Sequence, residues 1–295
     1  MVIETLSPGA DLPIARTIAD LRGIVNDWRR QGFSVGFVPT MGALHEGHLA
    51  LVAEALRQAD RVVTSVFVNP TQFAAHEDLA TYPRREARDA ELLAGAGCHL
   101  LYAPSVEEMY PAGAVTRITV GDTETGGPSQ TLEGAARPQM FGGVALVVTK
   151  LLNQVQPDVA VFGEKDWQQL AVIRRMAVDL DMPVRIVGVP TARDGHGLAL
   201  SSRNAYLSET ELEVARRLNG ILAEAAITAA SGASIAAVEA EAASALLAQG
   251  FARVDYVAIR QPDLASFEND RVDGPGRILA AAVLGTTRLI DNMAV

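Results

Sequence analysis

The chain has 295 residues, of which 49% are hydrophobic and 20% charged, as in a packed globular protein of about two domains. Its 25 basic and 35 acidic residues leave a formal net charge of −10, which argues against a nucleic-acid partner or an anionic membrane surface. The single cysteine, Cys98, excludes an internal disulfide and a cysteine-built metal site. Because no membrane-spanning run or signal peptide is visible, we expect a cytoplasmic protein.

The first two thirds of the chain alternate helical and extended patterns. Apolar residues at near-helical spacing predict a helix over 14–31, and β-branched runs predict strands at 35–38 and 61–68. Repeated β–α units predict an α/β fold, a Rossmann-like doubly wound parallel sheet spanning residues 1–188. The remaining segments are helices from about 48 to 60 and at 84–95, 144–155 and 167–180, strands at 99–103, 158–162 and 184–189, and an irregular region at 121–143.

The pattern changes close to residue 190. Ser208, followed three residues later by Glu211, fits a capping box that opens a long alanine-rich helix. The segment SGAS at 231–234 interrupts that helix, and a second one runs to about Gln249. Helices followed by strands predict a smaller C-terminal α+β domain over 189–295. Its strands are expected at 254–260, 277–284 and 286–293.

A first candidate site is the segment PTMGALHEGH at 39–48, where a predicted strand ends and a helix begins. Helix N-termini present free N–H groups and a positive dipole end, which suit phosphate. His45 and His48 are three residues apart and can share a face of the first turn, where both imidazoles would donate to phosphate oxygens. An ordinary βα turn with two surface histidines fits the segment equally well. A metalloprotease zinc site fits it less well, because that motif needs two histidines four residues apart.

Two further segments carry cationic side chains. FGEKDWQQ at 162–169 directly follows a predicted strand, and its Lys165 suits a phosphate as a point charge. Ser201, Ser202 and Arg203 in LALSSRN at 198–204 would form an anion grip close to the predicted domain boundary. The alternatives are a solvated turn for the first segment and a polar linker for the second.

A fourth segment, FVNPTQF at 67–73, offers neutral amide groups. It follows the strand predicted at 61–68, and its amides could orient a hydroxylated or carboxylated substrate. Taken alone the signal is weak. All four segments fall where a doubly wound fold would bring them together, beyond the carboxyl ends of its strands.

Seven segments together resemble the pantoate–β-alanine ligase (pantothenate synthetase) family over essentially the whole chain. They are PTMGALHEGH, VFVNPTQF, YPR at 82–84, TLEGAARP at 131–138, FGEKDWQQL, GLALSSRN and TTRLIDN. HEGH is also similar to the HIGH motif of the wider nucleotidyltransferase superfamily. The resemblance implies ATP-dependent condensation of pantoate with β-alanine through a pantoyl adenylate, with Mg²⁺ as cofactor and a homodimeric assembly.

The resemblance also implies site residues. His48 would be the proton donor beside His45, Lys165 would bind the ATP phosphates, and Leu200 to Arg203 would form a mobile phosphate clamp. Gln72 and Gln169 would hold pantoate, Gln72 would also bind β-alanine, and Asp89 would lie at the magnesium. Together with Ala192 at the adenine, the ATP-binding set is Met41, Gly42, Ala43, Leu44, His45, Glu46, Gly47, His48, Gly163, Glu164, Lys165, Asp166, Ala192, Leu200, Ser201, Ser202 and Arg203. The catalytic set is His48, His45, Lys165, Ser201, Ser202 and Arg203.

The sequence departs from the family pattern at five positions. The usual RPGHF reads RPQMF, with Gln139 and Met140 in place of glycine and histidine. Trp167 replaces a common Tyr or Phe, Thr71 a common Met, and His196 the usual Asp of a DGLA segment. These departures leave the two histidines and Lys165 in place, so the activity remains the expectation.

Two other functions fit part of the pattern. A nucleotidylyltransferase that transfers AMP to a phosphate would need a basic pocket where Gln72 and Gln169 stand. A nucleotide-binding relative without catalysis is suggested by Gln139 and Met140. The neutral amides argue against the first alternative, and the retained phosphate-binding side chains argue against the second.

Overall fold

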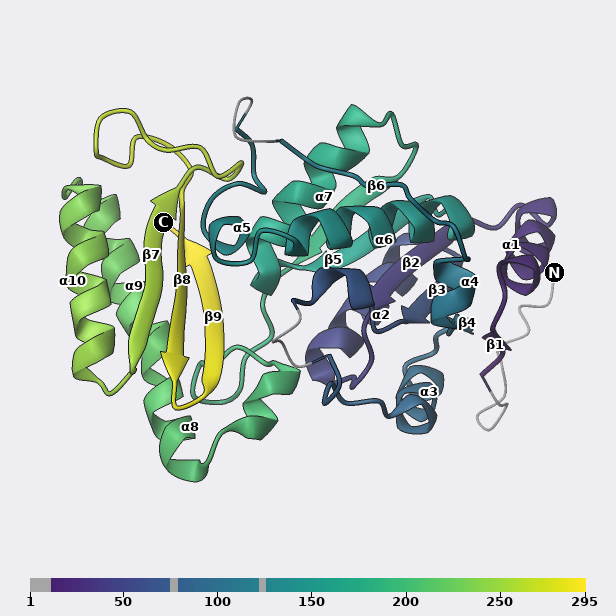
Figure 1. Cartoon of the computed structure of the whole chain (residues 1–295), viewed down its shortest axis with the longest axis horizontal. Coiled ribbons are helices and arrows are strands. Elements are labelled where there is room, and N and C mark those ends of the chain that lie inside the picture. Colours follow the sequence, from purple (N-terminus) through teal and green to yellow (C-terminus); the bar gives the residue numbers. More distant parts are fainter. Residues whose placement is uncertain (1–11, 75–78, 122–125) are drawn as a thin grey trace. The chain divides into compact units, whose positions relative to one another are not determined.

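The computed structural model describes residues 12–74, 79–121 and 126–295 (Figure 1). The chain divides into two compact units. Unit 1 comprises Met1–Ile118, Gly142–Phe162 and Met176–Val189, and unit 2 comprises Thr119–Phe141, Gly163–Arg175 and Pro190–Val295. The last division follows Val189, one residue after the predicted boundary, whereas two earlier segments join the second unit. The expected absence of a signal peptide concerns residues 1–11, which lie outside the described residues. Residues 122–125 of the predicted irregular region lie outside them as well.

Unit 1 is built around a six-stranded sheet in the order β1-β4-β3-β2-β5-β6. The pairs β1–β4, β4–β3, β3–β2 and β2–β5 are parallel. The strand order reverses between β2 and β5, so the sheet is doubly wound and the predicted fold class is confirmed. The strands are β1 (Ile14–Ala15), β2 (Val35–Thr40), β3 (Arg61–Val66), β4 (Leu100–Tyr102), β5 (Val159–Gly163) and β6 (Arg185–Val189).

Helices supply the crossovers between these strands, as the β–α alternation predicts. Buried Val38, Val52, Leu93 and Val161 belong to one apolar cluster, which joins strands β2 and β5 to helices α2 and α3. The helix predicted over 14–31 begins only at Ile18, because the preceding residues pair with β4 as β1. The helices are α1 (Ile18–Arg30), α2 (Glu46–Gln58), α3 (Glu86–Gly95), α4 (Val106–Met109), α6 (Met140–Val155) and α7 (Trp167–Asp179), the last two of which begin in unit 2.

Unit 2 contains an antiparallel sheet in the order β7-β8-β9. Helices α9 and α10 lie along the same side of this sheet (Figure 1), and their apolar residues share one cluster with those of β7 and β8. The predicted capping box of Ser208 and Glu211 is present, but the helix that it opens divides into α8 and α9 at Arg216. The elements are β7 (Arg253–Arg260), β8 (Arg277–Leu284), β9 (Thr287–Ala294), α5 (Glu133–Ala136), α8 (Glu209–Ala215), α9 (Arg217–Ala230) and α10 (Ile235–Ala248).

The membrane prediction has one direct test in the structure. Across residues 12–74, 79–121 and 126–295, no helix combines the length and the apolar character that crossing a bilayer requires.

Candidate active site

In unit 1 the two histidines cap the helix that follows β2. His45 is the N-cap of α2, and its Nδ1 accepts the N–H of Gly47 at 3.2 Å. The Nδ1 of His48 accepts the N–H of His45 at 3.3 Å, and the two ring centroids lie 4.1 Å apart. Since each Nδ1 accepts a backbone N–H, the proton of each neutral ring is assigned to Nε2. These Nε2–H groups lie at the positive end of a helix dipole.

Asp89 holds the loop that leads to these histidines. Its side chain is 1% exposed, and its two oxygens accept the N–H groups of Ala43 at 2.9 Å and Leu44 at 2.8 Å. Gly42 adopts φ +83°, and a Cβ there would lie 3.0 Å from an Asp89 oxygen. A side chain at position 42 would thus be strained and crowded at once. The sequence pattern alone did not reveal this contact.

This geometry does not fit the expected role of Asp89 at magnesium. Its carboxylate is buried, and each of its oxygens already accepts one backbone N–H, which makes Asp89 a support of the loop rather than an open ligand for an ion. Among the described residues, no three His, Cys, Asp or Glu side chains are grouped as a protein-built cation site requires. Magnesium commonly binds through substrate phosphates and water rather than in an all-protein cage, which is compatible with this arrangement.

Gln72 is positioned by the 3-10 turn η1 (Pro70–Gln72) after β3. Its Oε1 accepts from the amide of buried Asn69 at 2.9 Å, and its Nε2 lies 3.2 Å from the sulfur of Met41. Asn69 also donates to the Gly143 carbonyl at 3.2 Å and accepts from Tyr110 Oη at 2.8 Å. Within unit 1 the structure therefore brings Gln72 together with the loop that carries the histidines.

In unit 2, Lys165 stands in the 3-10 turn η2 (Glu164–Asp166). Its side chain is 20% exposed, and Nζ lies 4.0 Å from an Asp166 oxygen. The Glu164 carboxylate accepts from Arg277 at 3.1 Å, and the Arg277 guanidinium stacks over the Trp167 ring at 3.5 Å. The turn is thus held by its neighbours, and the Lys165 side chain stays partly exposed.

The segment from Ala192 to Arg203 also belongs to unit 2. Arg193 bridges Ala199, and the Leu200 N–H donates to the Ala192 carbonyl at 2.9 Å, so two predicted ATP-binding residues are paired in a hairpin. Ser201 caps the 3-10 turn η3 (Ser202–Tyr206) by accepting the Arg203 N–H at 3.2 Å. The predicted phosphate clamp therefore begins as a capped turn directly after the hairpin.

The two glutamines that follow Trp167 differ in environment. Gln168 is buried and bonded to three backbone groups, the N–H of Glu133 at 3.0 Å and the carbonyls of Pro128 at 2.8 Å and Thr131 at 2.7 Å. Gln169, the residue predicted to hold pantoate, is half-buried. Gln168 therefore has a structural role, and Gln169 remains the predicted ligand.

A buried ion-pair network in unit 2 was missed by the sequence analysis. Glu133 of TLEGAARP accepts both terminal nitrogens of Arg288 of TTRLIDN, at 2.7 and 2.6 Å, and the Tyr256 hydroxyl at 2.8 Å. The Arg288 Nε donates to Asp255 at 2.7 Å, beside the bulge in β7. Asp255 and Arg288 stand within predicted strands, and a charged side chain that a sheet buries needs a partner of opposite charge, which was the signal available in the sequence.

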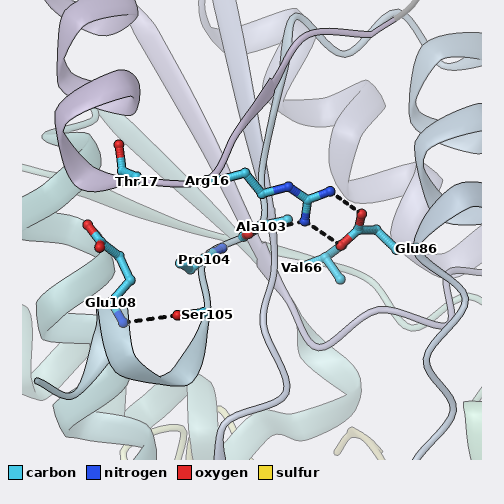
Figure 2. A pocket seen from close by; sticks show the side chains of 8 residues that line it. All are labelled: Arg16, Thr17, Val66, Glu86, Ala103, Pro104, Ser105 and Glu108. Atoms are coloured by element: carbon cyan, nitrogen blue, oxygen red, sulfur yellow. Dashed lines mark hydrogen bonds and ion pairs between the residues drawn. The ribbon is translucent and has the colours of Figure 1, made fainter.

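A cavity of about 340 Å³ lies in unit 1 beside the end of β4 (Figure 2). Arg16 projects into it, but the Arg16 guanidinium is held by both oxygens of Glu86, at 2.7 and 2.5 Å. Ser105 caps the short helix α4 by accepting the N–H of Glu108 at 3.2 Å. The Arg16 charge is thus already paired, and no predicted site residue lines the cavity, so we do not assign it to a substrate.

Comparison with known proteins decides among the functions that the sequence left open. The sequence model of the family described as pantoate-beta-alanine ligase matches residues 13–294. The chain belongs to the pantoate–β-alanine ligase family. Pantothenate synthetases of Mesorhizobium japonicum and Caulobacter vibrioides are 56% and 57% identical to it, over 96% of this chain and 97% and 98% of theirs.

Solved structures of the family agree. Pantothenate synthetase from Thermus thermophilus matches with a TM-score of 0.88 and 46% identity, over 96% of this chain and 99% of that one. Pantoate-beta-alanine ligase from Francisella tularensis, solved in complex with beta-gamma ATP and β-alanine, matches with a TM-score of 0.79 and 34% identity, over 96% and 97%. This chain is a ligase that condenses pantoate with β-alanine in an ATP-dependent reaction, as the resemblance implied.

Proposed function

We propose that the ligase works through a pantoyl adenylate. A carboxylate is a poor electrophile, so a pantoate carboxylate oxygen first attacks the α-phosphorus of ATP, and the bond to the β-phosphate breaks with release of pyrophosphate. The β-alanine amine then attacks the acyl carbon and loses a proton as AMP leaves. The observation that carries the proposal is the pair of histidine rings at the N-terminus of α2, each oriented by a backbone N–H that its Nδ1 accepts.

The charge that develops in the first step decides which residues act. Negative charge builds on the α-phosphate and on the departing pyrophosphate, and preorganised donors stabilise such charge more strongly than water does. We assign His45 and His48 to the phosphates, with His48 as the proton donor, and Lys165 as a point charge on the pyrophosphate. Ser201, Ser202 and Arg203 complete the phosphate clamp, and the loop from Met41, the turn from Gly163 and Ala192 bind the rest of ATP.

Neutral amides bind the other two substrates in this proposal. Gln72 and Gln169 hold pantoate, and Gln72 also contacts β-alanine. The bond from Asn69 to Gln72 Oε1 supports this assignment, because it orients the Gln72 amide and leaves its N–H₂ end toward Met41. An amide donates to a hydroxyl or carboxylate without the charge that would favour a phosphate acceptor, in keeping with pantoate as the acceptor of AMP.

Magnesium enters the proposal with ATP. The ion would neutralise phosphate charge when bound, and its ligands would be phosphate oxygens and water, since Asp89 is committed to the backbone of the loop. We further propose a homodimer in the cytoplasm, where ATP is supplied and Cys98 stays reduced. Sedimentation equilibrium of the purified protein tests the dimer.

Isotope exchange tests the reaction order. With pantoate, ATP and Mg²⁺ but no β-alanine, labelled pyrophosphate should enter ATP, because adenylate formation is reversible on the enzyme. Omitting pantoate is the control and should abolish exchange. Exchange that requires β-alanine would contradict a free-standing adenylation step.

A further inference from the structure

Strand β9 carries two adjacent buried polar residues, Asp291 and Asn292, each 3% exposed. Neighbouring residues of a strand point to opposite faces of the sheet, so these side chains reach different parts of unit 2. Buried polar groups in native proteins are nearly always hydrogen-bonded. Their partners therefore indicate what this end of the strand holds in place.

Asn292 holds the turn that carries Lys165. Its Nδ2 donates to the carbonyl oxygens of Glu164 at 2.9 Å and Lys165 at 2.8 Å, two of the three residues of η2. Its Oδ1 accepts from the Arg277 guanidinium, which also binds the Glu164 carboxylate. One amide thus fixes the backbone from which the Lys165 side chain projects.

Asp291 holds the hairpin that carries Ala192. Its carboxylate oxygens accept from both terminal nitrogens of Arg193, at 2.7 and 2.9 Å. The same guanidinium donates to the Gly197 carbonyl at 3.0 Å and the Asn292 carbonyl at 3.2 Å. Asp291 therefore ties the first strand and the turn of the hairpin, through Arg193, to the end of β9.

We propose that Asp291 and Asn292 are positioning residues for the adenylation step: Asn292 sets the place of Lys165, and Asp291 sets the hairpin from which Ala192 and the phosphate clamp extend. The proposal rests on the proposed function, since it takes Lys165 and Ala192 as ATP-binding residues. It gives β9 a role in holding two nucleotide-binding segments of unit 2, each through its own side chain, and neither side chain is placed on the substrate.

Asn292→Asp is the sharpest perturbation, because it keeps the acceptor for Arg277 and replaces two N–H donors by an oxygen that faces two carbonyls. In the pantoate-dependent exchange assay we expect kcat to fall at least tenfold with KM for pantoate unchanged. In a Lys165→Ala background the same substitution should change kcat less than twofold, because Asn292 acts through Lys165. If Asn292→Asp does not fold, Asn292→Ser, whose short hydroxyl cannot reach both carbonyls, takes its place in the same cycle.

Asp291→Asn tests the other contact. It removes the charge that pairs with Arg193, and we expect KM for ATP to rise fivefold or more. Because this effect runs through the hairpin, it should be equally large in the Lys165→Ala background. Thr287→Val, a substitution of a buried polar residue in the same strand away from both segments, is the matched control and should behave as the unmodified enzyme.

The outcomes separate this proposal from the proposed function. An Asn292→Asp effect that persists in full without the Lys165 ammonium, or is matched by Thr287→Val, overturns the positioning role of Asn292. An unchanged KM for ATP in Asp291→Asn overturns that of Asp291. Absence of pantoate-dependent exchange in the unmodified enzyme would instead overturn the adenylate route, and full activity of Lys165→Ala would overturn both the role of Lys165 and the proposal built on it.

Discussion

The carboxylate of Asp89 offers the most direct test of how the histidine loop is built. The two Asp89 oxygens accept the N–H groups of Ala43 and Leu44, immediately before the N-cap His45. In Asp89→Asn one oxygen remains an acceptor, and the other becomes an N–H₂ group that points at a backbone N–H. The substitution preserves size and removes one of the two contacts together with the negative charge.

The magnitude follows from these two bonds. A hydrogen bond to a charged group contributes about 1.5–3 kcal/mol, so losing one of them destabilises the observed loop conformation by about 2 kcal/mol. If ATP binds only this conformation, that loss lowers kcat/KM for ATP by up to about thirtyfold, since 1.4 kcal/mol corresponds to roughly tenfold. We expect little change in KM for pantoate, because the Gln72 amide is held separately by Asn69.

The assay is pantoate-dependent pyrophosphate exchange at varied ATP, repeated across a range of Mg²⁺ concentrations. Glu91→Gln, which removes a charge from an exposed position of the same helix α3, is the matched control and should leave the kinetics unchanged. Activity of Asp89→Asn that is restored by excess Mg²⁺ would make Asp89 a metal ligand and refute the loop argument. Unchanged kinetics would show that the two bonds do not govern the loop.

Three further outcomes are expected. Lys165→Ala should lower the exchange rate about 10²–10³-fold and leave pantoate binding nearly unchanged, as expected for the loss of one preorganised donor. An unchanged rate would favour the alternative that this segment is a solvated turn. Gln139→Gly combined with Met140→His should change KM for pantoate or kcat by no more than about tenfold, because buried Met140 fills the space and its sulfur contacts the Arg137 guanidinium. Activity that appears only in this double variant would refute that reasoning. Cys98 is 2% exposed, and burial raises the pKa of its thiol. At a pH of about 8, a disulfide reagent followed by absorbance should therefore modify the native protein far more slowly than the urea-unfolded chain. Equal rates would contradict a buried, inert thiol.

The fold was largely readable from periodicity. Long apolar helices and β-branched strands carry their own signal, so the parallel sheet was predicted, and the long helices and strands β2 to β9 were predicted in their order along the chain. The two-residue strand β1 carries none, because its pairing with β4 depends on a segment far along the chain, Ile14 lying opposite Leu101. The division between α8 and α9 at Arg216 could not be predicted either, because the residues around it keep a helical composition.

The candidate site was predictable only in part. Short segments such as HEGH and GEKD can be recognised directly, because chemistry-bearing residues stand together where a strand ends. Asp89 could not be assigned from sequence, since its two partners lie 46 and 45 residues earlier and the bonds exist only after folding. The same holds for Glu133 and Arg288, which lie 155 positions apart.

At three of the five positions where the sequence departs from the family pattern, the structure shows local contacts that accommodate the changed residue. At His196 the backbone N–H, and not the imidazole, makes the bond to Asp194, so the turn does not depend on the side chain at that position. The hydroxyl of Thr71 donates to Asn69 Oδ1 at 2.9 Å and reinforces the turn that ends in Gln72. The ring of Trp167 carries the stacked Arg277, and its N–H donates to the Pro262 carbonyl at 3.0 Å, a bond that Phe lacks.

These contacts argue against His196, Thr71 and Trp167 as causes of any loss of activity relative to the family. Each of the three departures either adds a contact or leaves the backbone bond in place, so none should displace the segments that carry His48 or Lys165. Gln139 and Met140 differ, because they replace a glycine and an imidazole at the start of α6, where a side chain of another shape occupies the space. If this ligase turns over more slowly than its relatives, that helix start is the place where its sequence explains the difference.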